Sequence, residues 1–429
     1  MGSCISKCMP NKHSRLEDHH VYDDDLYGFV QDKLVISQAP PFKVPPTPLS
    51  NKISPSPLEL SFSSKSASTI FTASKSSASS IPAQFLWPAE DTVRALDELD
   101  EPLIDLGGFF RGDHESTLRA AKAIREACLS HGFFQVVNHG IDWGLIQAAH
   151  DHIRSFFRSP IETKLRASQK RNGYGGYSSA HSERFSSRLP WKETLSFGYP
   201  ANSPEETVEF FKSKLGMEFE QTGKVYKKYC EAMKDLALGI MELLAISLGV
   251  GRLHYKELFN DSRSIMRCNY YPPCKKPSLV LGTGPHCDPT SLTVLHQDQV
   301  GGLEVSANGK WWKVRPHPDA LVINIGDSFM ALTNGMYKSG LHWAVVNESR
   351  ERMSLSFFMC PAPYKVVRPP QGLLYRDMNG ERKYPDFTWP ELLHFVKNHH
   401  RADTGDTLGH FSRWLLSQSA VLSCQDPQA

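Results

Sequence analysis

Two histidines and one aspartate have the chemistry and the spacing that an open iron site requires. His286 and Asp288 are separated by one residue, and His342 follows far downstream. Two imidazoles and one carboxylate can occupy one face of an octahedral non-haem Fe(II) and leave the remaining positions open. A structural zinc site would instead be closed by four ligands, commonly cysteines. We therefore expect these three residues to bind Fe(II).

The His-x-Asp spacing occurs three times, so the spacing alone does not identify the ligands. The three pairs are His286/Asp288, His296/Asp298 and His317/Asp319. The first pair precedes residues 291–295, whose β-branched content favours a strand. The second pair falls near the end of that strand, and the third lies beside Pro316 and Pro318, which are typical of a turn. We interpret the second and third pairs as solvated or hydrogen-bonded surface residues.

A strand downstream of the histidines predicts an arginine inside the fold. Residues 352–358 alternate, so that Arg352, Ser354 and Ser356 share one face and apolar side chains share the other. An arginine in a barrel interior is costly unless it is paired. A dicarboxylate co-substrate would supply that pairing through a bidentate contact. The pattern alone also permits a solvated strand arginine.

Several continuous motifs are shared with one known family. Residues 269–274 read NYYPPC, residues 189–194 read LPWKET, and residues 282–292 surround the first pair of ligands. With these motifs, the stretch from about residue 82 to residue 418 resembles the plant 2-oxoglutarate/Fe(II)-dependent dioxygenases. Within that family it is similar to the gibberellin 20-oxidases, because LPWKET together with NYYPPC belongs to a narrow branch.

The resemblance implies a role for each of these positions. His286, Asp288 and His342 resemble the iron ligands and, together with Arg352, the catalytic residues. The residues that resemble the co-substrate-binding positions are Asn269, Tyr271, Arg352 and Ser354. The resemblance implies Fe(II), 2-oxoglutarate as co-substrate and O2, with ascorbate as a supporting reductant.

The same resemblance implies a reaction and a substrate pocket. The reaction is successive oxidation of a gibberellin precursor at carbon-20, through alcohol and aldehyde, followed by loss of that carbon. The candidate substrate contacts are Leu189, Trp191, Lys192 and Thr194. One cation beside aromatic groups suits a carboxylate on an apolar ring system. The alternative is that Trp191 and Leu195 only anchor a loop over the pocket.

One residue departs from the family pattern and keeps other functions open. Trp343 follows the distal histidine, where the family usually has a basic residue. Period two turns Trp343 away from His342, so we expect iron binding to be preserved. The first alternative function is a related dioxygenase that acts on another apolar acid or a flavonoid. The second is a catalytically idle binding protein tethered to a membrane.

The composition favours a soluble intracellular protein. The 429 residues carry a formal net charge of +2, which gives no reason to expect nucleic acid as a partner. Nine cysteines without a Cys-x-x-Cys motif are typical of reduced thiols. No apolar run approaches the roughly 20 residues that a membrane span needs. We expect a cytoplasmic monomer.

Residues 1–81 differ in composition from the rest. A proline-rich stretch precedes one dominated by Ser, Ala, Lys and Thr, and both predict disorder. Gly2, with Ser6 in the preferred place, matches the myristoylation pattern, and Cys4 is a candidate for palmitoylation. One acyl chain binds membranes only marginally, so a second signal matters. The sequence therefore leaves two alternatives, membrane-surface association through acylation and an unmodified tail.

Hydrophobic periodicity predicts mostly helices up to residue 255 and mostly strands beyond it. Helices are expected at residues 118–130, 143–157, 223–248, 391–400 and 408–416, strands at 133–137 and 320–325, and a hairpin around Asn308-Gly309. Many short strands suit a double-stranded β-helix, or jelly roll, in a β-rich α+β fold with supporting helices at both ends. The expected divisions are a disordered extension at 1–81, an N-terminal helical region at 82–255, a jelly-roll core at 256–366 and a C-terminal helical segment at 367–429.

Overall fold

The computed structural model describes residues 81–168, 175–180, 188–378, 380–401 and 405–424. All of them fall in one compact unit. The predicted N-terminal extension, with Gly2 and Cys4, lies outside the described residues. Within these residues, none of the helices has the length and apolar character that a membrane crossing requires.

Two sheets form the centre of the fold. The larger sheet contains, in spatial order, β1 (Leu103–Asp105), β2 (Phe133–Val137), β10 (Leu321–Ile325), β7 (Leu292–Gln297), β12 (Arg352–Met359), β5 (Arg263–Tyr271), β4 (Glu193–Pro200) and β3 (Gly176–Ser179). The smaller sheet contains β6 (Thr283–His286), β11 (His342–Ala344), β8 (Leu303–Ala307) and β9 (Lys310–Lys313). A separate two-stranded ladder joins β13 (Val366–Val367) to β14 (Phe387–Thr388).

The two sheets enclose one pocket. Its walls include Asn269, Asn324 and Arg352 from the larger sheet and His342 and Leu303 from the smaller one. β12 pairs antiparallel with both β5 and β7. In this register, Ser354 of β12 lies opposite Asn269 of β5 and Gln297 of β7. Two facing sheets around a pocket make a double-stranded β-helix. The predicted fold class, a β-rich α+β fold with a jelly-roll core, is confirmed.

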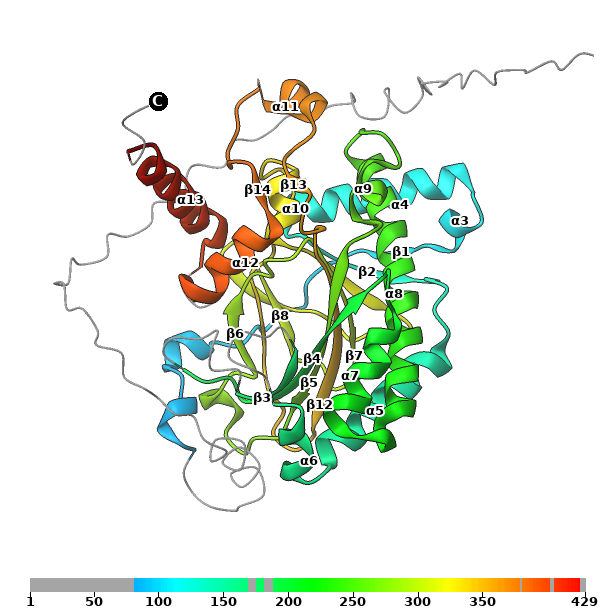
Figure 1. The fold of residues 1–429 in the computed structure, drawn as a ribbon, viewed down its shortest axis with the longest axis vertical. Coiled ribbons are helices and arrows are strands. Elements are labelled where there is room, and N and C mark those ends of the chain that lie inside the picture. The colour runs from blue at the N-terminus through cyan, green and yellow to red at the C-terminus, as the bar shows by residue number, and fades with distance from the viewer. Residues whose placement is uncertain (1–80, 169–174, 181–187, 379, 402–404, 425–429) are drawn as a thin grey trace, which may run out of the picture. The chain divides into compact units, whose positions relative to one another are not determined.

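Helices surround this core. The α-helices are α3 (Gly107–Phe110), α4 (His114–Ser130), α5 (Trp143–Arg158), α6 (Ile161–Arg166), α7 (Glu205–Leu215), α8 (Glu220–Ser247), α9 (His254–Phe259), α10 (Asp327–Leu332), α11 (Gln371–Met378), α12 (Trp389–Asn398) and α13 (Thr407–Cys424). Short 3₁₀ helices occur at Ala83–Phe85, Ala89–Thr92, Met217–Phe219 and Pro277–Leu279. Figure 1 shows α5, α7 and α8 side by side along the larger sheet, where α8 contacts β12 and β7. The apolar stripe predicted on residues 223–248 is therefore core packing.

The predicted elements agree with the structure except at their ends. α4 begins at His114, earlier than periodicity indicated, because Asp113 caps it by accepting a hydrogen bond from the Ser116 N–H at 2.8 Å. The hairpin between β8 and β9 turns at Asn308 and Gly309, whose φ values are 52° and 73°. Such left-handed values are what a two-residue hairpin loop needs.

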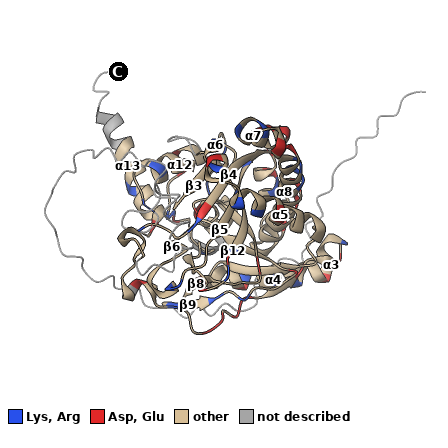
Figure 2. Cartoon of the chain, turned by 90° about the horizontal axis from the view of Figure 1, so that it is seen from below, with Lys and Arg blue, Asp and Glu red and all other residues tan. Residues whose placement is uncertain are grey.

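Charges of both signs lie side by side on the helical layer. Figure 2 shows blue and red residues together on α7, where Lys212 pairs with Glu209 at 3.6 Å. Glu206 of the same helix pairs with Arg263 of β5 at 3.0 Å. Mixed signs at close range agree with the near-neutral net charge of the whole chain.

Candidate metal and co-substrate site

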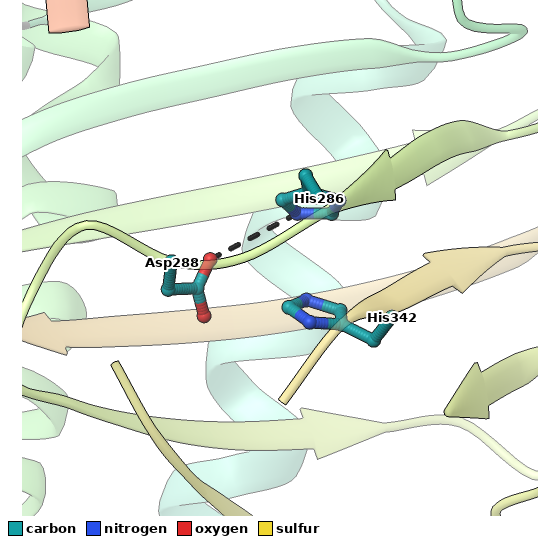
Figure 3. A group of neighbouring side chains, drawn as sticks. All are labelled: His286, Asp288 and His342. Atoms are coloured by element: carbon teal, nitrogen blue, oxygen red, sulfur yellow. Dashed lines mark ion pairs between the residues drawn. The ribbon is translucent and has the colours of Figure 1, made fainter. Parts of the chain in front are cut away.

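The three predicted iron ligands come together between the sheets. His286 ends β6 and is the direct cross-strand partner of His342 on β11, with their ring centroids 4.2 Å apart. Asp288 lies in the turn just after β6. One ligand atom from each residue lies within 4.8 Å of the others, and Figure 3 shows the two imidazoles and the carboxylate facing one another.

Both imidazoles are oriented by their own backbone. His286 Nδ1 donates to the Gly284 carbonyl at 2.9 Å, and His342 Nδ1 donates to the Gly340 carbonyl at 3.0 Å. A carbonyl only accepts, so these bonds place the proton on Nδ1 and give Nε2 the lone pair that binds a metal. His286 Nε2 lies 3.8 Å from Asp288 Oδ1.

Asp288 is held as a carboxylate with one oxygen toward the histidines. Its Oδ2 accepts hydrogen bonds from Thr293 Oγ1 at 2.6 Å and Asn324 Nδ2 at 2.9 Å. Burial acts to raise the pKa of Asp288, but His342, His286 and the two hydrogen bonds lower that pKa to about 2. Burial, together with the adjacent His342, lowers the pKa of His286 to about 3. Ionised carboxylate and neutral imidazole are the forms that bind metal.

This donor set fits Fe(II). Two imidazole nitrogens and one carboxylate oxygen, all approached from one side of a pocket, are the ligands of an open non-haem iron site. The hydrogen bonds on the atoms that face away from the metal position fix the ligands in place before a metal binds.

Arg352 lies inside the barrel, as predicted. Its side chain is 2% exposed, and its Nε donates to the Gly301 carbonyl at 2.6 Å. One Nη donates to Gln297 Oε1 at 3.2 Å, and the guanidinium lies 4.8 Å from the centroid of the Tyr271 ring. The other Nη is buried without a hydrogen-bond partner among the described residues. A buried donor left in this way fits a carboxylate supplied by a ligand.

Ser354 and Asn269 extend the same surface. They are cross-strand partners on β12 and β5, and Asn269 Nδ2 donates to Ser354 Oγ at 3.3 Å. Lys192 Nζ donates to Asn269 Oδ1 at 3.5 Å from the edge of β4. With Arg352, these groups line the pocket that holds the triad. Arg352, Ser354 and Asn269 present donors to one carboxylate, which fits the distal end of 2-oxoglutarate.

The LPWKET residues point in two directions. Lys192 lines the pocket, and Thr194 is paired in register with Asn269. Trp191 is 1% exposed, packs edge-on against Phe85 at 5.2 Å and donates to the Pro272 carbonyl at 3.2 Å. The partly buried Leu189 packs against the same cluster of side chains.

Glu193 faces away from the pocket. Its Oε2 accepts hydrogen bonds from Lys164 Nζ at 2.6 Å and from Tyr177 Oη at 2.7 Å, and the Lys164–Glu193 ion pair is almost fully buried. Sequence reasoning did not identify this pair. Period two predicts the outward direction of Glu193 but not its partner on α6.

The interpretation of His296 as a surface residue was wrong. His296 is 4% exposed, and its Nδ1 lies 2.7 Å from His150 Nε2 on α5, at hydrogen-bond distance. A helix covers the outer face of β7 at this point, so an outward strand residue is buried instead of solvated. Asp298 accepts from the Met353 N–H at 2.5 Å. Asp319 is exposed, in agreement with the interpretation of the third pair.

Trp343 is turned away from the iron ligands, as period two predicts. It is 2% exposed, its Nε1 donates to Glu304 Oε2 at 2.7 Å, and its ring stacks on Trp311 with centroids 3.8 Å apart. The side chain therefore anchors β11 from behind. The residues that support the site from within, Thr293, Asn324 and Gln297, were not predicted, and their only signal is an inward position on a strand.

Comparisons with known proteins agree with this geometry. Residues 262–361 match the model of the 2OG-Fe(II) oxygenase superfamily, and residues 102–214 match that of the non-haem dioxygenase in morphine synthesis N-terminal region. The crystal structure of JOX2 in complex with 2OG, Fe and JA is similar, with a TM-score of 0.65 and 31% identity over 78% of this chain and 94% of JOX2. The rice dioxygenase for auxin oxidation has a TM-score of 0.59 and 27% identity over 72% of this chain and 99% of its own.

The chain belongs to the 2OG-Fe(II) oxygenase superfamily and is an Fe(II)/2-oxoglutarate-dependent dioxygenase. It is 54% identical over 342 residues to gibberellin 20 oxidase 2 of Oryza sativa subsp. indica. The aligned residues cover 79% of this chain and 86% of the relative. It is 52% identical over 345 residues to gibberellin 20 oxidase 3 of Arabidopsis thaliana. The aligned residues cover 79% of this chain and 90% of the relative. The predicted resemblance is confirmed.

Proposed function

We propose that the chain oxidises a gibberellin precursor at carbon-20, first to the alcohol and then to the aldehyde, and finally releases that carbon. One observation carries the proposal: relatives at 51–54% identity over about 79% of the chain are gibberellin 20 oxidases from rice, Arabidopsis and wheat. The aligned region is long enough to include the helical layer, both sheets and the pocket. This reaction is a step in gibberellin biosynthesis.

The chain's own residues bind and orient the reactants. His286, Asp288 and His342 hold Fe(II), and Arg352 with Ser354 holds the distal carboxylate of 2-oxoglutarate. When bound, Fe(II) and 2-oxoglutarate supply the O2-dependent oxidising chemistry, which converts 2-oxoglutarate to succinate and CO2. The sheets exclude bulk water around the site, since Asp288 and Arg352 are nearly fully buried. Exclusion of water strengthens electrostatic contacts and limits side reactions.

The substrate contacts are proposed on the LPWKET strand. Lys192 presents an ammonium group to the pocket, and Thr194 lies on the same strand face. Trp191 and Leu189 shape the adjacent wall through their packing in the cluster around Phe85. Lys192→Met tests the assignment: unchanged KM values for gibberellin and 2-oxoglutarate would remove Lys192 from both binding sites.

Location and assembly are further proposals. We propose a cytoplasmic monomer, with membrane-surface association through acylation of Gly2 and Cys4. The supporting pattern is the N-terminal sequence itself. Gly2→Ala is expected to move membrane-associated protein to the supernatant after centrifugation. Wild-type protein found only in the supernatant would refute the acylation proposal.

The reaction itself is tested with a C20 gibberellin precursor. Purified protein with Fe(II), 2-oxoglutarate and ascorbate is expected to yield alcohol, aldehyde and carbon-20-free products, resolved by mass spectrometry. Asp288→Ala serves as the control, because it removes a ligand and its charge, and is expected to give no product. Succinate without any gibberellin product would direct the search to another apolar acid or a flavonoid.

A further inference from the structure

A second arginine lies inside the barrel, beyond the one that faces the co-substrate. Arg267 is on β5, two residues before Asn269, and lines the same pocket as the iron ligands. Its cross-strand neighbours are Ser196 on β4 and Ser356 on β12. Arg267 therefore occupies the inward row next to that of Asn269 and Ser354, displaced along the strands.

Arg267 makes no direct ion pair among the described residues, and the carboxylate that stabilises its charge from a distance, Asp288, belongs to the proposed metal triad. Its Nε donates to the neutral Ser196 hydroxyl at 3.0 Å, and its guanidinium lies 5.4 Å from the centroid of the Phe358 ring. No carboxylate forms an ion pair with it in the part of the chain that the structure describes. Arginine remains protonated in proteins, so an internal guanidinium is costly until an anion joins it.

The other cations of the pocket come from β12 and from the residue before β4, on either side of β5. Arg352 is adjacent to Ser354 on the inward face of β12, and Lys192 contacts Asn269, which in turn donates to Ser354. Arg352 thus lies at the end of the pocket assigned to 2-oxoglutarate, whereas Lys192 is the cation already proposed as a substrate contact. Arg267 lies on the opposite side of the Asn269–Ser354 pair from Arg352, beside the ring face of Phe358.

We infer that Arg267 binds the carboxylate of the substrate, while Phe358 packs against its apolar ring system. This inference rests on the proposed function, because gibberellin precursors combine a carboxylate with an apolar skeleton. The guanidinium can form a bidentate contact with that carboxylate, which would orient as well as hold the substrate. Arg267 is thereby a specificity-determining residue that selects acids over neutral terpenoids.

The inference is tested with Arg267→Gln and with the methyl ester of the substrate. We expect Arg267→Gln to raise KM for the gibberellin acid about 10- to 100-fold, as loss of a charge-assisted contact does, while KM for 2-oxoglutarate stays unchanged. Wild-type enzyme should disfavour the ester relative to the acid, and Arg267→Gln should lose that discrimination. Arg267→Lys should recover part of the affinity, because a single point charge is restored.

The matched control is Arg263→Gln, which changes an exposed arginine on the same strand that pairs with Glu206. It should leave both KM values unchanged. A rise in KM for 2-oxoglutarate alone in Arg267→Gln would assign this guanidinium to the co-substrate and overturn the inference. Equal turnover of acid and ester by the wild type would overturn it without any variant. Wild-type protein that oxidises no gibberellin would instead refute the proposed function.

Discussion

Each metal ligand is fixed by a hydrogen bond at the atom that does not face the metal. The two histidines donate from Nδ1 to carbonyls of their own strands, and Asp288 accepts at Oδ2 from Thr293 and Asn324. The ligands are therefore oriented before a metal enters. Loss of such a supporting bond typically lowers metal affinity about 10- to 100-fold.

Thr293→Val removes one supporting bond at almost constant volume. We expect Fe(II) affinity to fall about 10- to 100-fold, the usual cost of a lost outer-shell partner, as measured by anaerobic calorimetric titration. Thr222→Val is the control, since Thr222 is a buried threonine on α8 that contacts His152 instead of a ligand. Equal affinities for both variants and the wild type would show that Thr293 does not support Asp288.

Arg352→Lys replaces a fork of donors by a point charge. KM for 2-oxoglutarate should rise about 10- to 100-fold, because one or more charge-assisted bonds are lost, while Fe(II) affinity should remain. Steady-state kinetics with varied 2-oxoglutarate measure this. Arg350→Lys is the matched control on the exposed residue two positions earlier. An unchanged KM in Arg352→Lys would place the co-substrate elsewhere in the pocket.

At the scale of residues, the sequence predicted site residues where the residue types and their spacing fit few other roles. The triad and Arg352 were predicted because few other patterns explain two histidines, an aspartate and an inward arginine together. Thr293 and Asn324 were not, because inward polar residues are common on strands and only the fold shows which of them reach Asp288. His296 was misjudged because its partner, His150, comes from α5 and no local pattern connects them.

At the scale of elements, β4 and the residues just before it both line the pocket and anchor a helix. Lys192, just before β4, lines the pocket, Thr194 lies opposite Asn269 of β5, and Glu193 contacts Lys164 of α6. The buried Lys164–Glu193 pair, with Tyr177 as a further donor, fixes α6 against the larger sheet. The glutamate of LPWKET is thus an anchor of the pocket wall.

Glu193→Ala leaves the ammonium of Lys164 buried without its counterion. Breaking a buried pair in this way costs about 3–5 kcal/mol, and we expect a loss of that size in the free energy of unfolding by urea. The double variant Lys164→Met/Glu193→Leu should recover most of the loss, because neither charge remains. Glu205→Ala, which removes an exposed partner of Lys227, should change stability little. A stable Glu193→Ala variant would contradict the anchoring role.

Element types were predictable, but their ends and partners were not. The helices expected at residues 143–157 and 223–248 correspond to α5 and α8, and residues 133–137 form β2. Periodicity and the Asn308-Gly309 turn carry that information locally. The side chain of Asp113 extends α4 toward the N-terminus, and such caps move a boundary without changing the apolar pattern.

At the scale of the whole molecule, the jelly roll was predictable from many short strands, but the strand order was not. β1 and β2 precede α5 and α8 in sequence and yet extend the larger sheet through β10. Such distant pairings depend on complementary surfaces that no single stretch encodes. The expected divisions at residues 81, 255 and 366 remain predictions.

A buried pair of histidines makes stability depend on pH. Burial, with a smaller contribution from His296 and Arg154, lowers the pKa of His150 to about 3, and burial with a smaller contribution from His139 lowers the pKa of His296 to about 4. Above the ordinary histidine pKa of about 6.5 both states are neutral, so the full stability is present. As pH falls from there toward the folded values, only the unfolded chain takes up protons. Each histidine then removes about 1.4 kcal/mol per pH unit.

Urea unfolding at pH 7.5 and pH 5 measures this dependence. The variant His150→Gln/His296→Asn retains hydrogen-bonding groups but cannot titrate, so its stability should fall less between the two pH values than that of the wild type. The comparison cancels the contributions of other histidines, which are common to both proteins. Equal losses in the two proteins would show that the buried pair is not the cause.

The most direct test of the whole account is the coupling between co-substrate and substrate. Purified protein with Fe(II), O2 and 2-oxoglutarate is incubated with and without a C20 gibberellin precursor, and succinate and oxidised gibberellin are quantified together. We predict that succinate formation depends on the precursor and that one succinate accompanies each two-electron oxidation at carbon-20. Succinate formed at the same rate without precursor, with no oxidised gibberellin, would contradict the account.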